Sequence, residues 1–140
     1  MQFCKGYLSE REQYSAMKKS ILIVDDDRNT CISIGKALSK NYITHTASNG
    51  QEALDILGKN RDIQIILTDI VMPEMNGLEL LEKIHFLNNK KIVIMITGYT
   101  ELESAMEAKH LGVYDYISKP VDLDRLEASL KNAFEKIEFN

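Results

Sequence analysis

The sequence lacks several features that would assign it to a particular class of protein. It has only two cysteines, Cys4 and Cys31, which are too few and too far apart for a disulfide framework or a zinc site. No apolar run approaches the ~18 residues of a membrane-spanning helix, and the N-terminal stretch MQFCKGYLSEREQYSA has no apolar core of a signal peptide. These absences favour a reduced, cytoplasmic setting without a membrane partner.

The chain also lacks an excess of positive charge. It has 17 basic and 21 acidic residues and a net charge of −4, which gives no footprint for nucleic acid or an anionic membrane. No internal repeat or low-complexity segment is present. What remains is an ordinary globular composition, 44% hydrophobic and 27% charged over 140 residues, and we expect one domain with a real core. Residues 1–19 are polar and aperiodic, so we expect a disordered or loosely helical tail before a domain at 20–138.

Short apolar runs alternate with helical patterns from residue 20 onward. The apolar runs cover residues 20–24, 42–46, 63–68, 91–97 and 113–118. Their near-continuous apolar character, clearest in ILIV, IQIIL and IVIMI, predicts strands that are buried on both faces. Apolar residues at helical spacing follow each run, for example Leu80, Leu81, Ile84 and Leu87, and Asp27 and Asn49 stand where helix caps are expected. Five such units predict an α/β fold with a parallel sheet and helices on both faces.

Polar side chains stand at the ends of several of these strands. Asp25 and Asp26 end the first strand, Asp69 the third, Thr97 the fourth, and Lys119 follows the fifth. Ligands of open parallel sheets bind beyond the carboxyl ends of the strands, so we expect these side chains to converge. Clustered carboxylates repel one another, and a hard cation such as Mg²⁺ relieves the repulsion. With a lysine and a hydroxyl nearby, one carboxylate can act as the nucleophile that receives a phosphoryl group.

Five blocks together resemble the receiver domains of two-component response regulators. The blocks are ILIVDDD, ASNGQEAL, LTDIVMPEMNGLEL, IVIMITGYT and GVYDYISKPVD, and they extend from residue 20 to about 137. The last two are most similar to receivers of the nitrogen-regulatory type. The resemblance implies a flavodoxin-like, doubly wound (βα)5 fold, with a five-stranded parallel sheet in the order 2-1-3-4-5.

The resemblance also implies a role for each residue at the strand ends. Asp69 would be the phosphoacceptor, forming an aspartyl-phosphate. Lys119 would pair with the phosphoryl oxygens, and Thr97 would hydrogen-bond the phosphoryl group. Thr97 would also form a switch pair with Tyr116. Pro120 would follow Lys119 through a cis peptide bond.

The metal site follows from the same resemblance. Mg²⁺ would bind Asp26 directly, Asp25 mainly through a water, Asp69 itself, and the backbone carbonyl of Val71. Gly77 would help to shape the loop that follows the acceptor.

The function implied is signalling rather than metabolic catalysis. A histidine kinase or phosphotransfer protein would supply the phosphoryl group, and the chain would catalyse only its own phosphotransfer and dephosphorylation. The surface of the fourth helix, fifth strand and fifth helix would then change and signal to a downstream partner protein. A homodimer that forms on phosphorylation is also compatible with the resemblance. Few residues follow Pro120, so we expect the output to lie in a partner or in more of a longer chain.

Three other functions fit parts of the pattern. A haloacid-dehalogenase-like phosphatase would use Asp25 as the nucleophile and Asp27 as the second acid, but Asn29 stands where that motif needs Thr or Val. A pseudo-receiver would signal without phosphate, which the intact set of acids and lysine disfavours. A flavin carrier would need a phosphate cradle rich in Ser, Thr and Gly, and the first loop is acidic instead.

The lifetime of the phosphoryl group is expected to depend on two further positions. Val71 and Tyr99 would flank the phosphoryl group in the family. Val71 has no polar atom to orient an attacking water, and Tyr99 is large enough to cover the approach. We therefore predict a comparatively long-lived aspartyl-phosphate.

Overall fold

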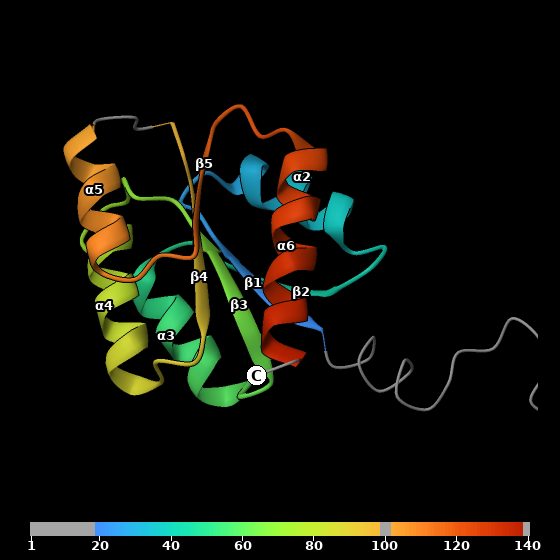
Figure 1. The fold of residues 1–140 in the computed structure, drawn as a ribbon, viewed down its shortest axis with the longest axis horizontal. Helices are drawn as coiled ribbons and strands as arrows, with labels where there is room; N and C mark the ends of the chain where they lie inside the picture. The colour runs from blue at the N-terminus through green and yellow to red at the C-terminus, as the bar shows by residue number, and fades with distance from the viewer. Residues whose placement is uncertain (1–18, 99–101, 139–140) are drawn as a thin grey trace, which may run out of the picture.

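The structure, a computed structural model, describes residues 19–98 and 102–138 (Figure 1). Strands and helices alternate along this part of the chain. Their bounds are β1 Ser20–Val24, α2 Arg28–Leu38, β2 Ile43–Ala47, α3 Gly50–Lys59, β3 Ile63–Thr68, α4 Gly77–Leu87, β4 Ile92–Thr97, α5 Leu102–His110, β5 Asp115–Ser118 and α6 Leu123–Glu138. No helix among the described residues is long and apolar enough to cross a bilayer.

The strands form one five-stranded sheet in the order β2-β1-β3-β4-β5, and every neighbouring pair is parallel. The predicted fold class and strand order are confirmed. The central strands β1 and β3 are almost wholly buried, as their continuous apolar runs predict. Strand β2 lies at an edge and is mostly exposed or half-buried, which explains why its sequence ITHTA alternates with polar residues.

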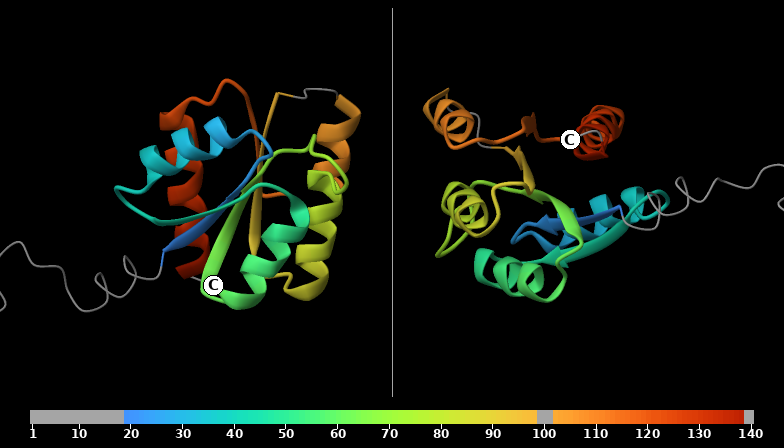
Figure 2. Two further views of the ribbon diagram at one scale, coloured as in Figure 1. Left: turned by 180° about the vertical axis from the view of Figure 1, so that it is seen from behind. Right: turned by 60° about the horizontal axis from the view of Figure 1, so that its bottom comes forward.

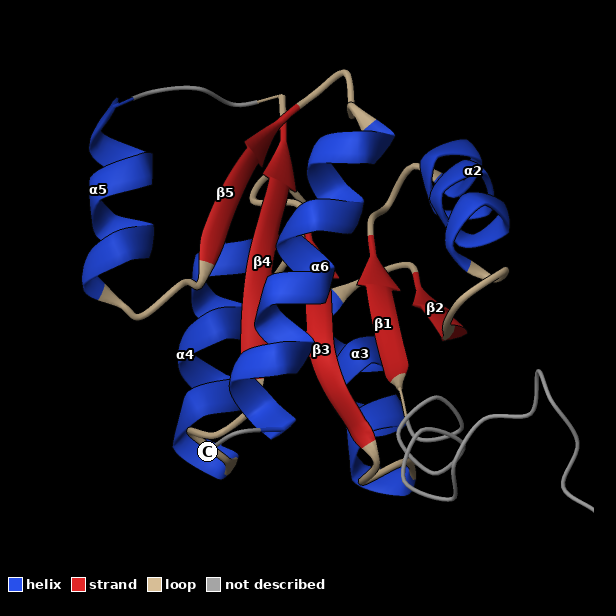
Figure 3. Cartoon of the chain, turned by 45° about the vertical axis from the view of Figure 1, so that its right-hand side comes forward, coloured by secondary structure: helices blue, strands red, loops and turns tan. Residues whose placement is uncertain are grey.

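Helices cover both faces of the sheet and divide the apolar core into two clusters. Helices α2 and α6 lie on one face, while α3, α4 and α5 lie on the other (Figures 2 and 3). Because successive side chains of a strand point to opposite faces, β1 sends Ile21 and Ile23 into the first cluster and Leu22 and Val24 into the second. Helices therefore cover both faces of the sheet, and they leave the two ends of the strands uncovered.

Side-chain caps fix where three of the helices begin. The carboxylate of Asp27 accepts a hydrogen bond from the backbone N–H of Asn29 at 3.0 Å and starts α2. The amide oxygen of Asn49 accepts from Glu52 N–H at the start of α3. Both caps confirm the sequence prediction. Helix α4 starts with a reciprocal capping box between Asn76 and Glu79, which the sequence analysis did not anticipate.

Strands β2 and β4 each begin one residue later than predicted, at Ile43 and Ile92. Two further departures have a structural reason. Strand β5 begins at Asp115 rather than at residue 113, because the N–H of Val113 is still bonded to the Ala108 carbonyl in the turn that closes α5. The predicted apolar stripe of α4 was wrong at Leu87, whose side chain is 71% exposed. Leu87 is the last residue of α4, and it lines a surface hollow with Leu54 of α3 rather than the apolar core.

Candidate functional site

The predicted site residues gather at one edge of the sheet, where the carboxyl ends of the central strands meet. Asp25 follows β1, Asp69 follows β3, Thr97 ends β4, and Lys119 follows β5. These strands are neighbours in the order β1-β3-β4-β5, so their ends lie side by side. The peptide bond that follows Lys119 is cis, as the family resemblance implied.

Lys119 joins the two buried carboxylates. Its ammonium nitrogen lies 2.7 Å from Asp25 Oδ2 and 2.8 Å from Asp69 Oδ2. The carboxylate side chains are only 5% and 11% exposed, while the lysine side chain is 24% exposed. One ammonium therefore neutralises two carboxylates that would otherwise repel each other in a poorly solvated space.

The carboxylate of Asp69 is held in a fixed orientation by its own loop. Its Oδ1 accepts hydrogen bonds from the backbone N–H groups of Ile70 at 2.7 Å and Val71 at 3.3 Å. The loop then returns so that Gly77 N–H bonds to the carbonyl of Ile70 at 2.8 Å. A Cβ atom on Gly77 would collide with the backbone carbonyl of Asp69, so only glycine fits there. The family expectation that Gly77 shapes this loop has a steric reason.

Burial and hydrogen bonding have opposing effects on the pKa values of the site. It raises the pKa of Asp25 above its ordinary value, although the hydrogen bond from Lys119 opposes the shift. Burial alone would lower the pKa of Lys119, but the hydrogen bonds to the two carboxylates outweigh it and raise that pKa. The cluster thus holds a firmly charged lysine beside a carboxylate that burial disfavours in its ionised form.

The remaining acids of the first loop differ in their surroundings. Asp27 caps α2, as predicted, and its N–H donates to Asp25 Oδ1 at 2.9 Å. The side chain of Asp26 is exposed, next to the buried pair. Val71, in the loop after Asp69, is also exposed, at 58%.

The donor set suits a magnesium ion. No group of three His, Cys, Asp or Glu side chains within the described ranges is already arranged around a metal position. Magnesium, however, commonly takes one or two carboxylates and completes its octahedron with waters and phosphate oxygens. Asp25 and Asp69 lie together around Lys119, and the exposed Asp26 directly follows Asp25, so the chain supplies carboxylate oxygens of the kind that this cation prefers.

The predicted switch residues lie on the strands beside the acceptor. Thr97 is fully buried, and its carbonyl accepts the N–H of Lys119 at 2.9 Å. Tyr116 is half-buried and packs against the apolar cluster under α3, α4 and α5. Burial raises the pKa of its phenol, and the charge of Asp69 adds to the rise. Tyr99, the predicted shield of the phosphoryl group, lies outside the described residues.

Sequence reasoning missed a second polar cluster, which lies between β5 and α6. Asp115 receives a two-pronged ion pair from Arg125, with both N···O distances at 2.8 Å, and a hydrogen bond from Ser129 at 2.6 Å. These bonds, led by that of Arg125, lower the pKa of Asp115. The cluster ties β5 to α6, and the spacing of ten residues between Asp115 and Arg125 gives no local signal of their contact.

Cys31 was predicted to be a small buried hydrophobe, and it is 6% exposed. Its thiol also donates a weak hydrogen bond to the carbonyl of Asp25 at 3.4 Å. Burial raises its pKa to about 11, so the thiol stays protonated and unreactive at neutral pH.

Known proteins share both the sequence pattern and the fold. The chain is 36% identical over 116 residues to sporulation initiation phosphotransferase F of Bacillus subtilis, covering 82% of this chain and 93% of that protein. It is 38% identical over 118 residues to the regulatory protein AtoC of Escherichia coli, of which it spans only 25% while 82% of this chain is covered. A receiver-domain structure from Clostridium thermocellum superposes with a TM-score of 0.83 at 29% identity, covering 86% of this chain and 98% of that one. Residues 21–131 match the family described as the response regulator receiver domain. The chain therefore belongs to the response regulator receiver domain family of two-component signalling.

Proposed function

We propose that Asp69 is the residue that accepts the phosphoryl group. The observation that carries this proposal is the contact of Lys119 with Asp69 Oδ2 at 2.8 Å, at an opening where two further carboxylates lie. Receiver domains are signalling proteins rather than metabolic enzymes. A histidine kinase or a phosphotransfer protein is accordingly the donor, and its phosphohistidine supplies the phosphoryl group.

The transfer uses an oxygen of the Asp69 carboxylate as the nucleophile. This oxygen attacks phosphorus in line, a P–O bond forms, and the P–N bond to the donor imidazole breaks with its electron pair leaving on nitrogen. The backbone N–H groups of Ile70 and Val71 hold the carboxylate in position for this attack. Lys119 pairs with the phosphoryl oxygens, where its charge stabilises the transition state.

Asp25, Asp26, Asp69 and the backbone carbonyl of Val71 would hold Mg²⁺. The bound cation would supply positive charge against the phosphoryl oxygens and the crowded carboxylates. Loss of a direct ligand in Asp26→Asn should weaken Mg²⁺ binding, as titration of the metal would measure. Asp62, an exposed aspartate directly before β3 and so at the opposite end of that strand from Asp69, provides the matched control Asp62→Asn. Equal Mg²⁺ affinity in both variants would contradict the role of Asp26.

Incubation with acetyl phosphate and Mg²⁺ tests the acceptor. Wild-type protein and the control Asp55→Asn, an exposed aspartate on α3, should both gain one phosphoryl group by intact mass. Asp69→Asn should gain none. A label that survives in Asp69→Asn and disappears in Asp25→Asn would instead favour the phosphatase-like reaction, in which the first strand carries the nucleophile.

We also propose that phosphorylation moves Thr97 toward the phosphoryl group and lets Tyr116 turn inward. The affected surface consists of α5, β5 and α6, which correspond to the fourth helix, fifth strand and fifth helix of the sequence analysis. This is a shift between two populations, which a phosphorylated Asp69 biases. Amide NMR shifts on adding beryllofluoride and Mg²⁺ should extend through residues 102–118 in wild type and should contract toward Asp69 in Thr97→Ala. Shifts confined to the acids in wild type would exclude this switch.

The remaining assignments are proposals of the same kind. Residues 20–138 are proposed to form the receiver unit, with residues 1–19 preceding it. Phosphohistidine is made from ATP, so we place the chain in the cytoplasm. A partner protein, or a second phosphorylated copy, would read the switched surface. Because the chain spans about a quarter of AtoC, the output of that longer protein is not carried over.

A further inference from the structure

The last turn of α4 exposes two large apolar side chains. Phe86 is 90% exposed and the adjacent Leu87 is 71% exposed. Single exposed hydrophobic residues are normal on soluble proteins, but neighbouring ones that border a hollow mark an interaction surface. The switch surface and the phosphorylation site use neither residue.

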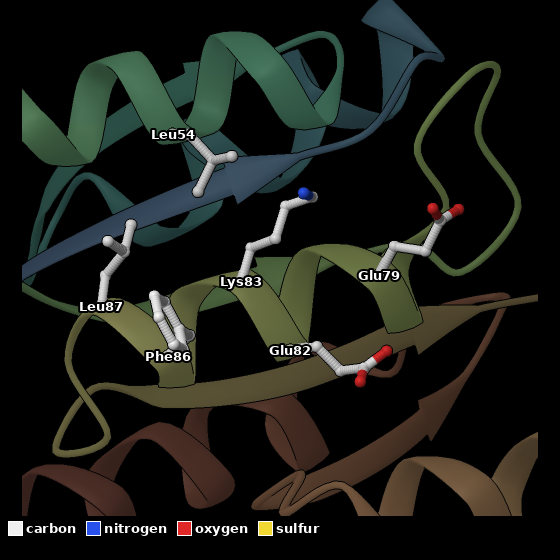
Figure 4. A pocket seen from close by; sticks show the side chains of 6 residues that line it. All are labelled: Leu54, Glu79, Glu82, Lys83, Phe86 and Leu87. Atoms are coloured by element: carbon white, nitrogen blue, oxygen red, sulfur yellow. The ribbon is translucent and has the colours of Figure 1, made fainter.

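A hollow of about 660 Å³ lies beside them, between α3 and α4. Its lining consists of Leu54, Glu79, Glu82, Lys83, Phe86 and Leu87. Figure 4 shows Leu54 of α3 facing Lys83 and Leu87 of α4 across this space, with Glu79 at one end and Leu87 at the other. A second hollow continues from Leu54 and Leu87 to Arg61, Asn88 and Lys91. We call the two together the α3–α4 groove.

The α3–α4 groove carries opposite charges at its two ends. Glu79, Glu82 and Lys83 line the half nearer the start of α4, which leaves that half with a net negative charge. Arg61 and Lys91 line the other end, beyond Leu87. The ammonium of Lys91 donates to the carbonyls of Arg61 and Ile63, so its charge stays at that end. The apolar side chains Leu54, Phe86 and Leu87 occupy the region between the ends.

Such a distribution is self-complementary. A two-fold axis through the middle of the groove places the acidic end of one copy on the basic end of the other, twice, and brings the two apolar centres together. Acid at the start and base at the end of a helix also suit the helix dipole. The dipole, however, gives no reason for a fully exposed phenylalanine between the two.

We propose that the α3–α4 groove is an interface between two copies of this chain, paired antiparallel across Phe86. The apolar centre is small, so the pairing is weak and concentration-dependent rather than obligate. The groove lies on different elements from α5, β5 and α6, so the pairing does not require phosphorylation.

Sedimentation velocity of the full, unphosphorylated chain over a concentration series up to millimolar tests the pairing. We expect wild type to shift from monomer toward dimer. Phe86→Ser should weaken the dimer about tenfold or more, since residues at an interface centre carry most of the affinity. Because Phe86 is almost fully exposed, this variant keeps its fold. Ile32→Ser, on the opposite face of the sheet and 45% exposed, should dimerise like wild type.

A charge exchange tests the antiparallel arrangement itself. Glu82→Lys reduces the acidic end and Arg61→Glu the basic end, so each variant alone opposes like charges and should dimerise about tenfold more weakly. An equimolar mixture should recover the dimer, because each altered end then meets its opposite. Three results would overturn the proposal: a wild-type chain that stays monomeric throughout, which would leave the groove to a different protein; a dimer that Phe86→Ser leaves intact; or a mixture no tighter than its components.

Discussion

Replacing Lys119 with methionine should destabilise the metal-free protein by about 2–3 kcal/mol at pH 7. Breaking a buried ion pair by removing one partner costs about 3–5 kcal/mol, because the other charge is left buried and unpaired. Here two carboxylates lose their partner, at 2.7 and 2.8 Å. The lysine side chain is still 24% exposed, so water screens part of the interaction, and we take the lower end of the range or less.

Urea denaturation at pH 7 in EDTA measures this loss, with Lys131→Met, an exposed lysine on α6, as the control. The control should stay within about 0.5 kcal/mol of wild type. The melting temperature of Lys119→Met should fall by about 6–12 °C.

The dependence on pH has a definite sign. In Lys119→Met, the pKa of Asp25, which burial already raises, loses the opposing influence of Lys119 and rises further. A carboxyl group whose pKa is higher in the folded than in the unfolded state destabilises the protein only above the unfolded-state pKa, where the unfolded chain loses its proton. The deficit should therefore shrink as pH falls toward the ordinary value of 3.8 and grow toward neutrality.

Magnesium should reverse much of the defect. Without the ammonium, the carboxylates lose a competing cation, so the variant should bind Mg²⁺ at least as tightly as wild type. Added Mg²⁺ should then raise its stability more than that of wild type. A variant as stable as wild type at pH 7 in EDTA, or a deficit that deepens on acidification, would refute the reasoning.

Two further predictions concern the fold around the site. Arg125→Met should lower the free energy of unfolding by about 0.5–1 kcal/mol at pH 7, since the ion pair is partly exposed. Because Arg125 lowers the pKa of Asp115, the wild type holds this advantage above the ordinary pKa of 3.8 and should lose it as pH falls through the lowered pKa. Urea titrations at pH 7 and pH 3 would show it, and an equal difference at both would contradict the pairing. Gly77→Ala should lower the free energy of unfolding by about 2–3 kcal/mol, because the alanine Cβ has no room beside the carbonyl of Asp69. Gly58→Ala, in the exposed last turn of α3 where a Cβ meets no other atom, should instead stabilise the protein by about 0.5–1 kcal/mol. A change of the same sign for both variants in thermal melts would remove the steric argument.

The sequence predicted the sheet well because its central strands are buried on both faces. The runs at 20–24 and 63–68 match β1 and β3 residue for residue. Prediction was weaker where neither burial nor periodicity was continuous. The turn that closes α5 extends through Val113, whose N–H bonds to the Ala108 carbonyl, and Leu87 follows the helical spacing of a core residue although it is exposed.

The convergence of Asp25, Asp69 and Lys119 followed from strand order and the location of strand ends. Which of these acids Lys119 contacts did not follow from the same reasoning. Sequence indicated that a lysine lay near the acids, but not that its ammonium would touch both carboxylates while Asp26 remained exposed. Such distances depend on side-chain rotamers, which the spacing of residues along a chain does not determine. The contact of Asp115 with Arg125 was missed for the same reason.

The division of the apolar core by the sheet has a consequence for how the chain can vary. Leu81 of α4 and Leu126 of α6 belong to different clusters, separated by the thickness of the sheet. Substitutions that share no contacts tend to be independent in their energetic effects. The layer formed by α2 and α6 can therefore drift in sequence without compensating changes in α3, α4 and α5, and each layer is free to adapt to its own partner. The strands, which supply side chains to both clusters, cannot change on one side without altering the backbone that the other side shares.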